Sequence, residues 1–136
     1  MHICCFYVVY NGNERVFFEE LGYVPVGLSY LSGALKQAGY STEGLCNKFN
    51  KPIDGLLNNL EKKPDIFAVS VSSMYSFPKA CELMEQIRNR FKDAKIIVGG
   101  FYPTLCPDNA ILNKNVDAIC IGEGEKAMVE YANQVR

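Results

Sequence analysis

The sequence has little of what several large classes of protein require. It contains a single histidine, and its six cysteines include no C-x-x-C pair and no two at the spacing of zinc ligands. Its formal net charge is −1, and no apolar run approaches the roughly 20 residues of a membrane span. We therefore expect no structural zinc site, no nucleic-acid partner and no membrane anchor.

Several catalytic motifs are missing as well. The sequence has no P-loop and no G-x-G-x-x-G after its first β-rich run. It also has no Ser/His/Asp or Cys/His arrangement, because its one histidine, His2, lies at the start of the first strand, the end away from the expected site. The N-terminus also lacks the basic region and cleavage site of a signal peptide. These features predict a cytoplasmic protein with reduced and mostly buried cysteines, among which Cys106 is the most exposed.

What the sequence does contain is a regular alternation of β-rich and helical segments within one domain, residues 1–136. This pattern predicts a doubly wound, five-stranded parallel sheet in the order 2-1-3-4-5, the flavodoxin-like Rossmann fold of the α/β class. The connection 11–24 is long enough to be a functional loop. We expect strands at 3–10, 40–46, 66–71, 95–98 and 118–121, and helices at 26–38, 53–61, 77–91, 107–112 and from about 123.

Two glycine turns follow the last two predicted strands. Gly99-Gly100 comes directly after Ile96-Ile97-Val98, and Gly122-Glu123-Gly124 comes directly after Ala118-Ile119-Cys120-Ile121. Ligands of open α/β sheets bind outside the carboxyl ends of the strands, and glycine lets a ligand approach the backbone closely. The two turns therefore predict a floor for a large, flat ligand.

The polar residues beside these turns allow two readings. Ser70, Ser72 and Ser73 follow the third predicted strand, where they would cap the next helix or line a buried ligand. Glu123 and Glu125 would be first-turn acids that suit a helix N-terminus, or paired carboxylates for acid/base chemistry. A phosphate-accepting receiver domain is disfavoured, because the expected aspartate at the end of strand three is replaced by Ser70-Val71-Ser72.

Taken in order, the motifs resemble a known family. They are Pro25-Val26-Gly27-Leu28 leading a helix that ends at Gly39, Pro64-Asp65-Ile66 with Val69-Ser70-Val71-Ser72, Val98-Gly99-Gly100-Phe101-Tyr102-Pro103-Thr104, and Val116-Asp117-Ala118 through Gly122-Glu123-Gly124-Glu125. The series is similar to the cobalamin (vitamin B12)-binding domain that precedes the catalytic barrel of radical S-adenosylmethionine enzymes, such as methyltransferases or cyclase-like relatives.

The resemblance implies the ligand and the residues that hold it. In related domains the corrin ring lies over the carboxyl edge of the sheet, and the detached nucleotide tail enters a pocket between the sheet and a helix. Ser70, Ser72, Gly99 and Gly100 would line the tail pocket here, so Gly99→Val or Gly100→Val should block the tail and spare much of the fold. The implied cofactor-binding residues are Tyr23, Val24, Pro25, Gly27, Ser70, Ser72, Ser73, Gly99, Gly100, Tyr102, Pro103, Glu123 and Gly124.

Two departures from related families refine this expectation. Methionine synthase and the B12 mutases place a cobalt-ligating histidine three residues before the glycine that matches Gly27, and that position is Val24 here. Cobalamin would therefore bind base-off and without a histidine ligand, a state that suits methyl transfer. The C-x-x-x-C-x-x-C of a [4Fe–4S] cluster is also missing, so the barrel that binds S-adenosylmethionine would follow Arg136, and the chain should not catalyse alone.

The same departures leave a second hypothesis open. A domain that has lost cobalamin could keep the fold and serve as a cofactor-free interaction domain of a radical S-adenosylmethionine protein. A stand-alone flavin or nucleotide binder is less favoured, because the glycine-rich fingerprint after the first strand is missing.

Overall fold

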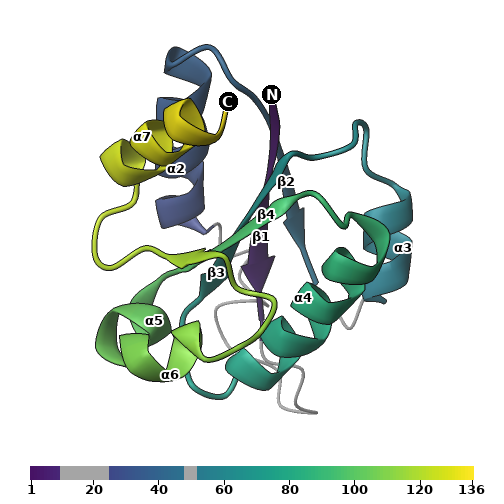
Figure 1. The fold of residues 1–136 in the computed structure, drawn as a ribbon, viewed down its shortest axis with the longest axis vertical. Helices are drawn as coiled ribbons and strands as arrows, with labels where there is room; N and C mark the ends of the chain where they lie inside the picture. Colours follow the sequence, from purple (N-terminus) through teal and green to yellow (C-terminus); the bar gives the residue numbers. More distant parts are fainter. Residues whose placement is uncertain (10–24, 48–51) are drawn as a thin grey trace.

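A five-stranded parallel sheet forms the centre of the molecule. The computed structural model describes residues 1–9, 25–47 and 52–136. The strands lie side by side in the order β2-β1-β3-β4-β5, which confirms the predicted order and fold class. Their bounds are β1 His2–Val8, β2 Ser41–Cys46, β3 Ile66–Val71, β4 Lys95–Gly99 and β5 Ala118–Ile119 (Figure 1).

Helices cover both faces of this sheet. On one face, α2 (Val26–Gln37) lies beside α7 (Glu125–Val135), and on the other face lie α3 (Ile53–Asn58) and α4 (Phe77–Arg90) (Figure 1). Two short helices, α5 (Phe101–Leu105) and α6 (Pro107–Ile111), connect β4 to β5. Within the described ranges, no helix is long and apolar enough to cross a membrane.

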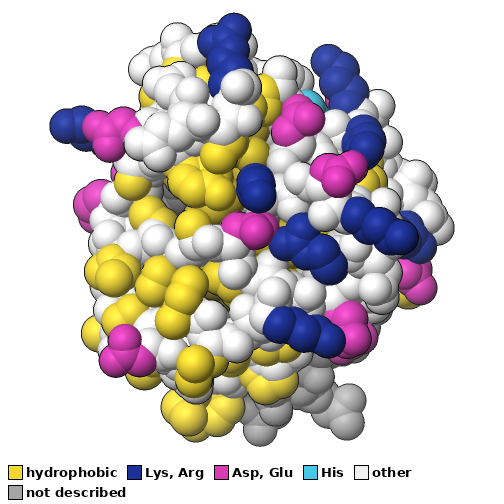
Figure 2. Space-filling view, in the orientation of Figure 1, with side chains coloured by type: hydrophobic (Ala, Val, Ile, Leu, Met, Phe, Trp, Pro, Cys, Tyr) yellow, Lys and Arg dark blue, Asp and Glu magenta, His cyan; other side chains and the backbone are white. Residues whose placement is uncertain are grey.

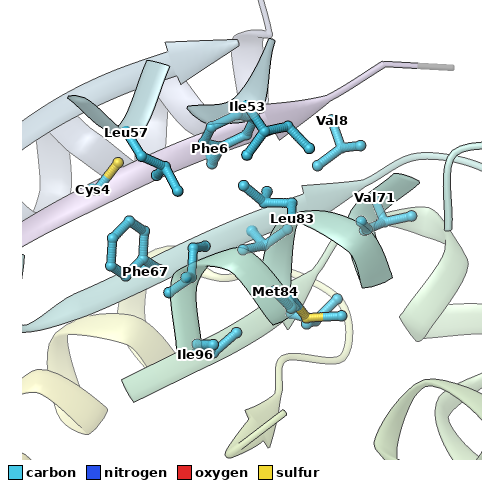
Figure 3. Close-up of a cluster of buried hydrophobic side chains, with 14 of the residues drawn as sticks. Cys4, Phe6, Val8, Ile53, Leu57, Phe67, Val71, Leu83, Met84 and Ile96 are labelled. Atoms are coloured by element: carbon cyan, nitrogen blue, oxygen red, sulfur yellow. The ribbon is translucent and has the colours of Figure 1, made fainter. Parts of the chain in front are cut away.

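The two faces of the sheet build two separate cores because successive strand residues point to opposite sides. Cys4, Phe6 and Val8 of β1 belong to the core under α3 and α4, which also contains Phe67 and Val71 of β3 (Figure 3). Ile3 and Cys5 point the other way and pack under α2 and α7. Both sets are almost fully buried, as expected for a parallel sheet covered on both faces.

Several element boundaries differ from the prediction; β1, for example, ends at Val8 and β4 extends to Gly99. The helix expected at 53–61 ends at Asn58, since the backbone N–H of Glu61 donates to the Glu43 carboxylate at 3.0 Å and not to a helix carbonyl. The strand expected at 118–121 pairs only over Ala118–Ile119. The last helix begins at Glu125, two residues later than expected.

Helix α5 is not among the predicted helices, which resume at 107–112 after the strand at 95–98. Proline is tolerated in the first turn of a helix, where its missing N–H has no helical acceptor in any case. Pro103 is the third residue of α5, and the helix is closed by bonds from the N–H groups of Thr104 and Cys106. The short helix predicted at 107–112 is confirmed as α6.

Candidate functional site

A row of small residues crosses the carboxyl edge of the sheet on the face covered by α2 and α7. Ser70 of β3 lies in register with Gly99 of β4, and Cys120 continues beyond β5, where its N–H donates to the Val98 carbonyl at 2.8 Å. The preceding row on the same face contains Ala68 and Ile97. On β4 the side chain shrinks from Ile97 to Gly99 toward this edge, which leaves space between the sheet and the two helices.

This space is a cavity of about 150 Å³, which we call the edge pocket. Its floor comes from the ends of β3 and β4, and its walls come from α2, α7 and the loop that precedes α7. The lining is mostly apolar or glycine, and its polar side chains are a hydroxyl, a thiol and two carboxylates. The lining residues are Gly27, Leu28, Leu31, Ala68, Val69, Ser70, Ile97, Gly99, Gly100, Cys120, Gly122, Glu123, Gly124, Glu125 and Met128.

Gly99, the last residue of β4, and Gly100, which follows it, have different roles. A Cβ atom on Gly99 would lie 3.5 Å from the Cβ of Cys120, an ordinary contact, so a side chain there would enter the edge pocket without displacing backbone. Gly100 has φ +105°, and a Cβ atom on it would lie 2.6 Å from the carbonyl oxygen of Val71. The expectation that Gly100→Val spares the fold is therefore wrong, because β3 leaves no room for any side chain at this position.

The three predicted serines lie in three different environments. Ser70 lines the edge pocket. Ser73 belongs to the turn before α4, where the Ser76 hydroxyl donates to its carbonyl at 3.0 Å. Ser72 is exposed and lies outside the edge pocket. The N-cap of α4 is Ser76, which makes no side-chain capping bond, so the expectation that one of the three serines caps this helix is wrong. The ligand-lining reading suits Ser70.

The remaining predicted residues are only partly brought together. Gly27, Glu123 and Gly124 join Gly99 and Gly100 around the edge pocket. Tyr102 packs against Phe77 with ring centroids 4.7 Å apart, on the side of the sheet that α4 covers.

Two further predicted residues, Pro103 and Pro25, do not line the edge pocket. Pro103 is buried within α5. Pro25 precedes α2, where its carbonyl accepts the N–H of Ser29 at 3.1 Å. Tyr23 and Val24, together with the predicted functional loop, lie outside the described residues.

Cys120 is a pocket residue that the sequence analysis did not single out. Burial raises the pKa of its thiol, and the nearby Glu125 carboxylate raises the pKa further, so the thiol is neutral at pH 7. Leu28, Leu31 and Met128 were also missed as lining residues. Leu28 and Leu31 lie three residues apart on α2, a spacing typical of a helix face packed on a core, and this spacing gives no sign of the cavity beside them.

Metal-ligating side chains do not gather in the described part of the chain. No group of three or more His, Cys, Asp or Glu residues there could hold a metal ion. His2 is 6% exposed and lies at the amino end of β1, the opposite edge from the edge pocket. Its ring contacts the Ser41 hydroxyl at 2.9 Å and the Glu43 carboxylate at 3.2 Å. His2 therefore stabilises the junction of β1 and β2.

Solved structures share this fold at low sequence identity. A cobalamin-binding protein from Desulfitobacterium hafniense matches with a TM-score of 0.64 and 14% identity, over 97% of this chain and 57% of that one. The receiver domain of the stress response regulator RcsB from Escherichia coli matches with a TM-score of 0.62 and 17% identity, over 99% of this chain and 91% of that one. RcsB from Salmonella typhimurium matches with a TM-score of 0.61 and 16% identity, over 99% of this chain and 58% of that one.

These likenesses show the fold and leave the function open. This chain spans little more than half of the cobalamin-binding protein and of the Salmonella regulator. No curated protein matches the chain.

Fold and site together define a flavodoxin-like domain with a ligand-sized cavity at the carboxyl edge of its sheet. The family model for the B12 binding domain matches residues 20–132. The chain belongs to the B12 binding domain family, and this confirms the family expected from the ordered motifs. A cobalamin-binding domain is thus supported.

Proposed function

We propose that this chain binds cobalamin with the nucleotide tail in the edge pocket and the corrin ring over the carboxyl edge of the sheet. The observation that carries the proposal is the edge pocket itself, which opens beneath the two glycine turns in a chain of the B12 binding domain family. Ser70 and Gly99 would contact the tail, and Gly27, Glu123 and Gly124 would stand at the rim.

The size of the edge pocket supports this division of the ligand. An apolar cavity of about 150 Å³ accommodates one aromatic ring such as benzene, whereas sites for whole drug-sized ligands measure roughly 300 Å³ or more. The edge pocket, at about 150 Å³, suits a ring-sized group and is too small for a corrin. Gly99 and Gly124 keep it open, because a Cβ on either would point at Cys120.

We further propose that the bound cobalamin is base-off and has no histidine ligand from this chain. The sequence contains one histidine, and His2 is held by Ser41 and Glu43 at the amino edge of the sheet. It is buried there, at the opposite edge from the edge pocket. Cobalamin, when bound, would supply cobalt-centred group transfer, while this chain holds the tail and orients the ring.

The proposed context is a radical S-adenosylmethionine enzyme of the methyltransferase or cyclase-like kind. The support is the ordered set of motifs from Pro25 to Glu125. A barrel with a [4Fe–4S] cluster would use the cobalamin held by this domain. The coding sequence after Arg136 tests this directly, because such a barrel requires a C-x-x-x-C-x-x-C motif.

A second candidate function is a cofactor-free domain that docks on such a barrel. It is favoured by the exposed apolar side chains of α5 and the chain after α6, namely Phe101, Leu105 and Leu112, which are 74%, 77% and 80% exposed. Figure 2 shows hydrophobic side chains gathered over α5 and α6 at the lower left. A partner domain would bury this surface.

One binding experiment separates the two candidates. The purified chain is mixed with hydroxocobalamin, free ligand is removed by gel filtration, and the visible spectrum is recorded. We expect the parent to retain corrin absorbance. A parent that retains none would contradict the cobalamin proposal and favour the docking domain.

The Gly99→Val variant tests the pocket assignment. Valine should fill the edge pocket and weaken hydroxocobalamin binding at least tenfold, on the order of 1.4 kcal/mol. Gly44→Val is the matched control, since Gly44 is also a strand glycine and a Cβ there meets nothing within 4 Å. Parental affinity in Gly99→Val would show that the tail lies elsewhere.

A further inference from the structure

Thr104 joins the two glycine turns through its hydroxyl group. The hydroxyl donates a hydrogen bond to the carbonyl oxygen of Gly100 at 2.7 Å. The hydroxyl oxygen of Thr104 also accepts a hydrogen bond from the backbone N–H of Gly122 at 3.0 Å. Thr104 does not line the edge pocket, whereas Gly100 and Gly122 both do. It therefore acts on the cavity through these two glycines.

The Gly100 side of this bridge is firmly held. Gly100 packs so closely against the backbone of Val71 that no Cβ atom fits between them. Thr104 itself is fixed by α5, where its N–H donates to the Gly100 carbonyl at 3.2 Å. Next to it, Tyr102 packs on Phe77. The hydroxyl of Thr104 thus projects from a rigid base.

The Gly122 side is held by much less. Strand β5 pairs with β4 through two residues, and one further bond joins the Cys120 N–H to Val98. Helix α7 then begins at Glu125. Across residues 121–123, within the part of the chain that the structure describes, the bond from Gly122 to Thr104 is the one hydrogen bond to another element. This loop supplies Gly122 and Glu123 to the wall of the edge pocket.

We infer that Thr104 is a positioning residue. It sets the separation of the two glycine turns and so determines how well the aromatic base of the nucleotide tail fits in the edge pocket. The inference rests on the proposed function and extends it to a residue outside the cavity. Loss of the hydroxyl removes the hydrogen bond that holds the Gly122 N–H, so the loop of residues 121–123, which forms part of the pocket wall, can move. The corrin ring, which is too large for the edge pocket, depends on this wall much less than the tail does.

The test compares cobalamin with cobinamide, which keeps the corrin ring and lacks the nucleotide tail. Thr104→Val keeps the shape of the side chain and removes the hydroxyl, and Thr104→Ser keeps the hydroxyl. Thr42→Val is the matched control, because the Thr42 hydroxyl also makes a half-buried hydrogen bond, to Ser32 at 2.7 Å. Affinities are measured by spectroscopic titration of the 136-residue chain. Hydrogen exchange of the Gly122 amide is followed without ligand.

We expect Thr104→Val to lower the affinity for cobalamin about tenfold and to leave the affinity for cobinamide within about twofold of the parent. Thr104→Ser and Thr42→Val should bind both ligands as the parent does. The Gly122 amide should exchange faster in Thr104→Val alone.

Two results would overturn the inference while the proposed function stands: unchanged cobalamin affinity in Thr104→Val, or equal losses for cobalamin and cobinamide. An unchanged exchange rate of the Gly122 amide would overturn it as well. If the parent binds neither ligand, the proposed function fails and takes the inference with it.

Discussion

At the scale of single residues, glycine illustrates how one residue type serves several purposes. Gly99, Gly100 and Gly122 belong to the same pair of turns, and the sequence predicts one common purpose for them, access for a ligand. In the structure, position 100 must be glycine because the backbone of Val71 leaves no room for a Cβ atom there, whereas Gly99 leaves the edge pocket open. Gly122 has φ +77° and meets nothing within 4 Å, so its requirement is conformational.

The adjacent thiols of β1 make stability depend on alkaline pH. Burial raises the pKa of Cys5 from 9.0 to about 11 and raises the pKa of Cys4 as well. Above pH 9, thiols of the unfolded chain ionise while those of the folded chain stay protonated, so protons leave on unfolding. Stability should therefore be complete below about pH 9 and fall by about 1.4 kcal/mol per pH unit for each such thiol above it.

Urea denaturation at several pH values between about 8 and 10.5 measures this loss of stability. Cys5→Ala should show a shallower decline than the parent. Cys106→Ala, which removes an exposed thiol, should keep the parental slope. A stability that does not change across this interval would contradict the prediction.

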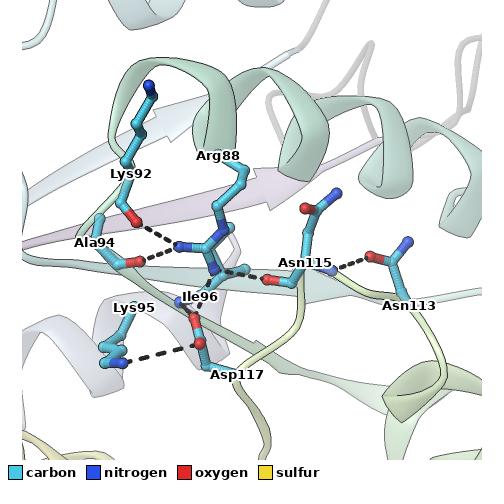
Figure 4. Close-up of polar contacts among 8 residues, drawn as sticks. All are labelled: Arg88, Lys92, Ala94, Lys95, Ile96, Asn113, Asn115 and Asp117. Atoms are coloured by element: carbon cyan, nitrogen blue, oxygen red, sulfur yellow. Dashed lines mark hydrogen bonds and ion pairs between the residues drawn. The ribbon is translucent and has the colours of Figure 1, made fainter.

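At the scale of elements, Arg88 of α4 fastens the weak edge of the sheet. Its guanidinium donates to the carbonyls of Ala94 at 2.8 Å and Asn115 at 3.0 Å, and to the Asp117 carboxylate at 2.7 Å (Figure 4). Asp117 in turn accepts the N–H of Ile96 at 2.8 Å. The end of α4, the start of β4 and the entry to β5 are thus joined, which compensates for the short pairing of β5.

We expect Arg88→Ala to lower the free energy of unfolding by about 2–3 kcal/mol, because it removes the donor from the carbonyls of Ala94 and Asn115 and one donor from the Asp117 carboxylate. Arg90→Ala is the matched control on the same helix. Arg90 pairs with the exposed Asp54, and surface ion pairs contribute about 1 kcal/mol or less. Chemical denaturation measures both variants, and equal losses would show that the Arg88 contacts are no stronger than a surface pair.

The elements also show where sequence patterns succeed. Strand β3 and helix α4 were placed to within one residue, because each is long, strongly patterned and packed against the core. Helix α5 was missed because five residues around a proline carry no helical periodicity. The end of α3 was misplaced because it depends on Glu43, a residue of β2 that is distant in sequence.

At the scale of the whole molecule, the proposed function predicts that cobalamin raises the stability of the folded chain. A ligand that binds only the folded state stabilises it by about 2.7 kcal/mol at a concentration of 100 times Kd. For a chain of this size, hydroxocobalamin at that excess should raise Tm by roughly 10 °C. Differential scanning calorimetry measures the shift. A Gly99→Val variant that gains the same increase would argue against a tail in the edge pocket.

The sequence by itself determined the strand order, the two-sided packing and the edge of the sheet at which the edge pocket lies. It could do so because hydrophobic periodicity and right-handed crossovers leave few arrangements for alternating strands and helices. Six of the binding residues that the resemblance implies line this pocket: Gly27, Ser70, Gly99, Gly100, Glu123 and Gly124.

Only the tertiary structure decided which of these residues share one cavity. Ser70, Gly99 and Cys120 meet because three strands align in register, whereas Tyr102 turns to the opposite face to pack on Phe77. The link from Thr104 to Gly122 spans 18 residues and depends on the close fit of Gly100 against β3. Such contacts form between segments brought together by packing, and no local pattern in the sequence encodes them.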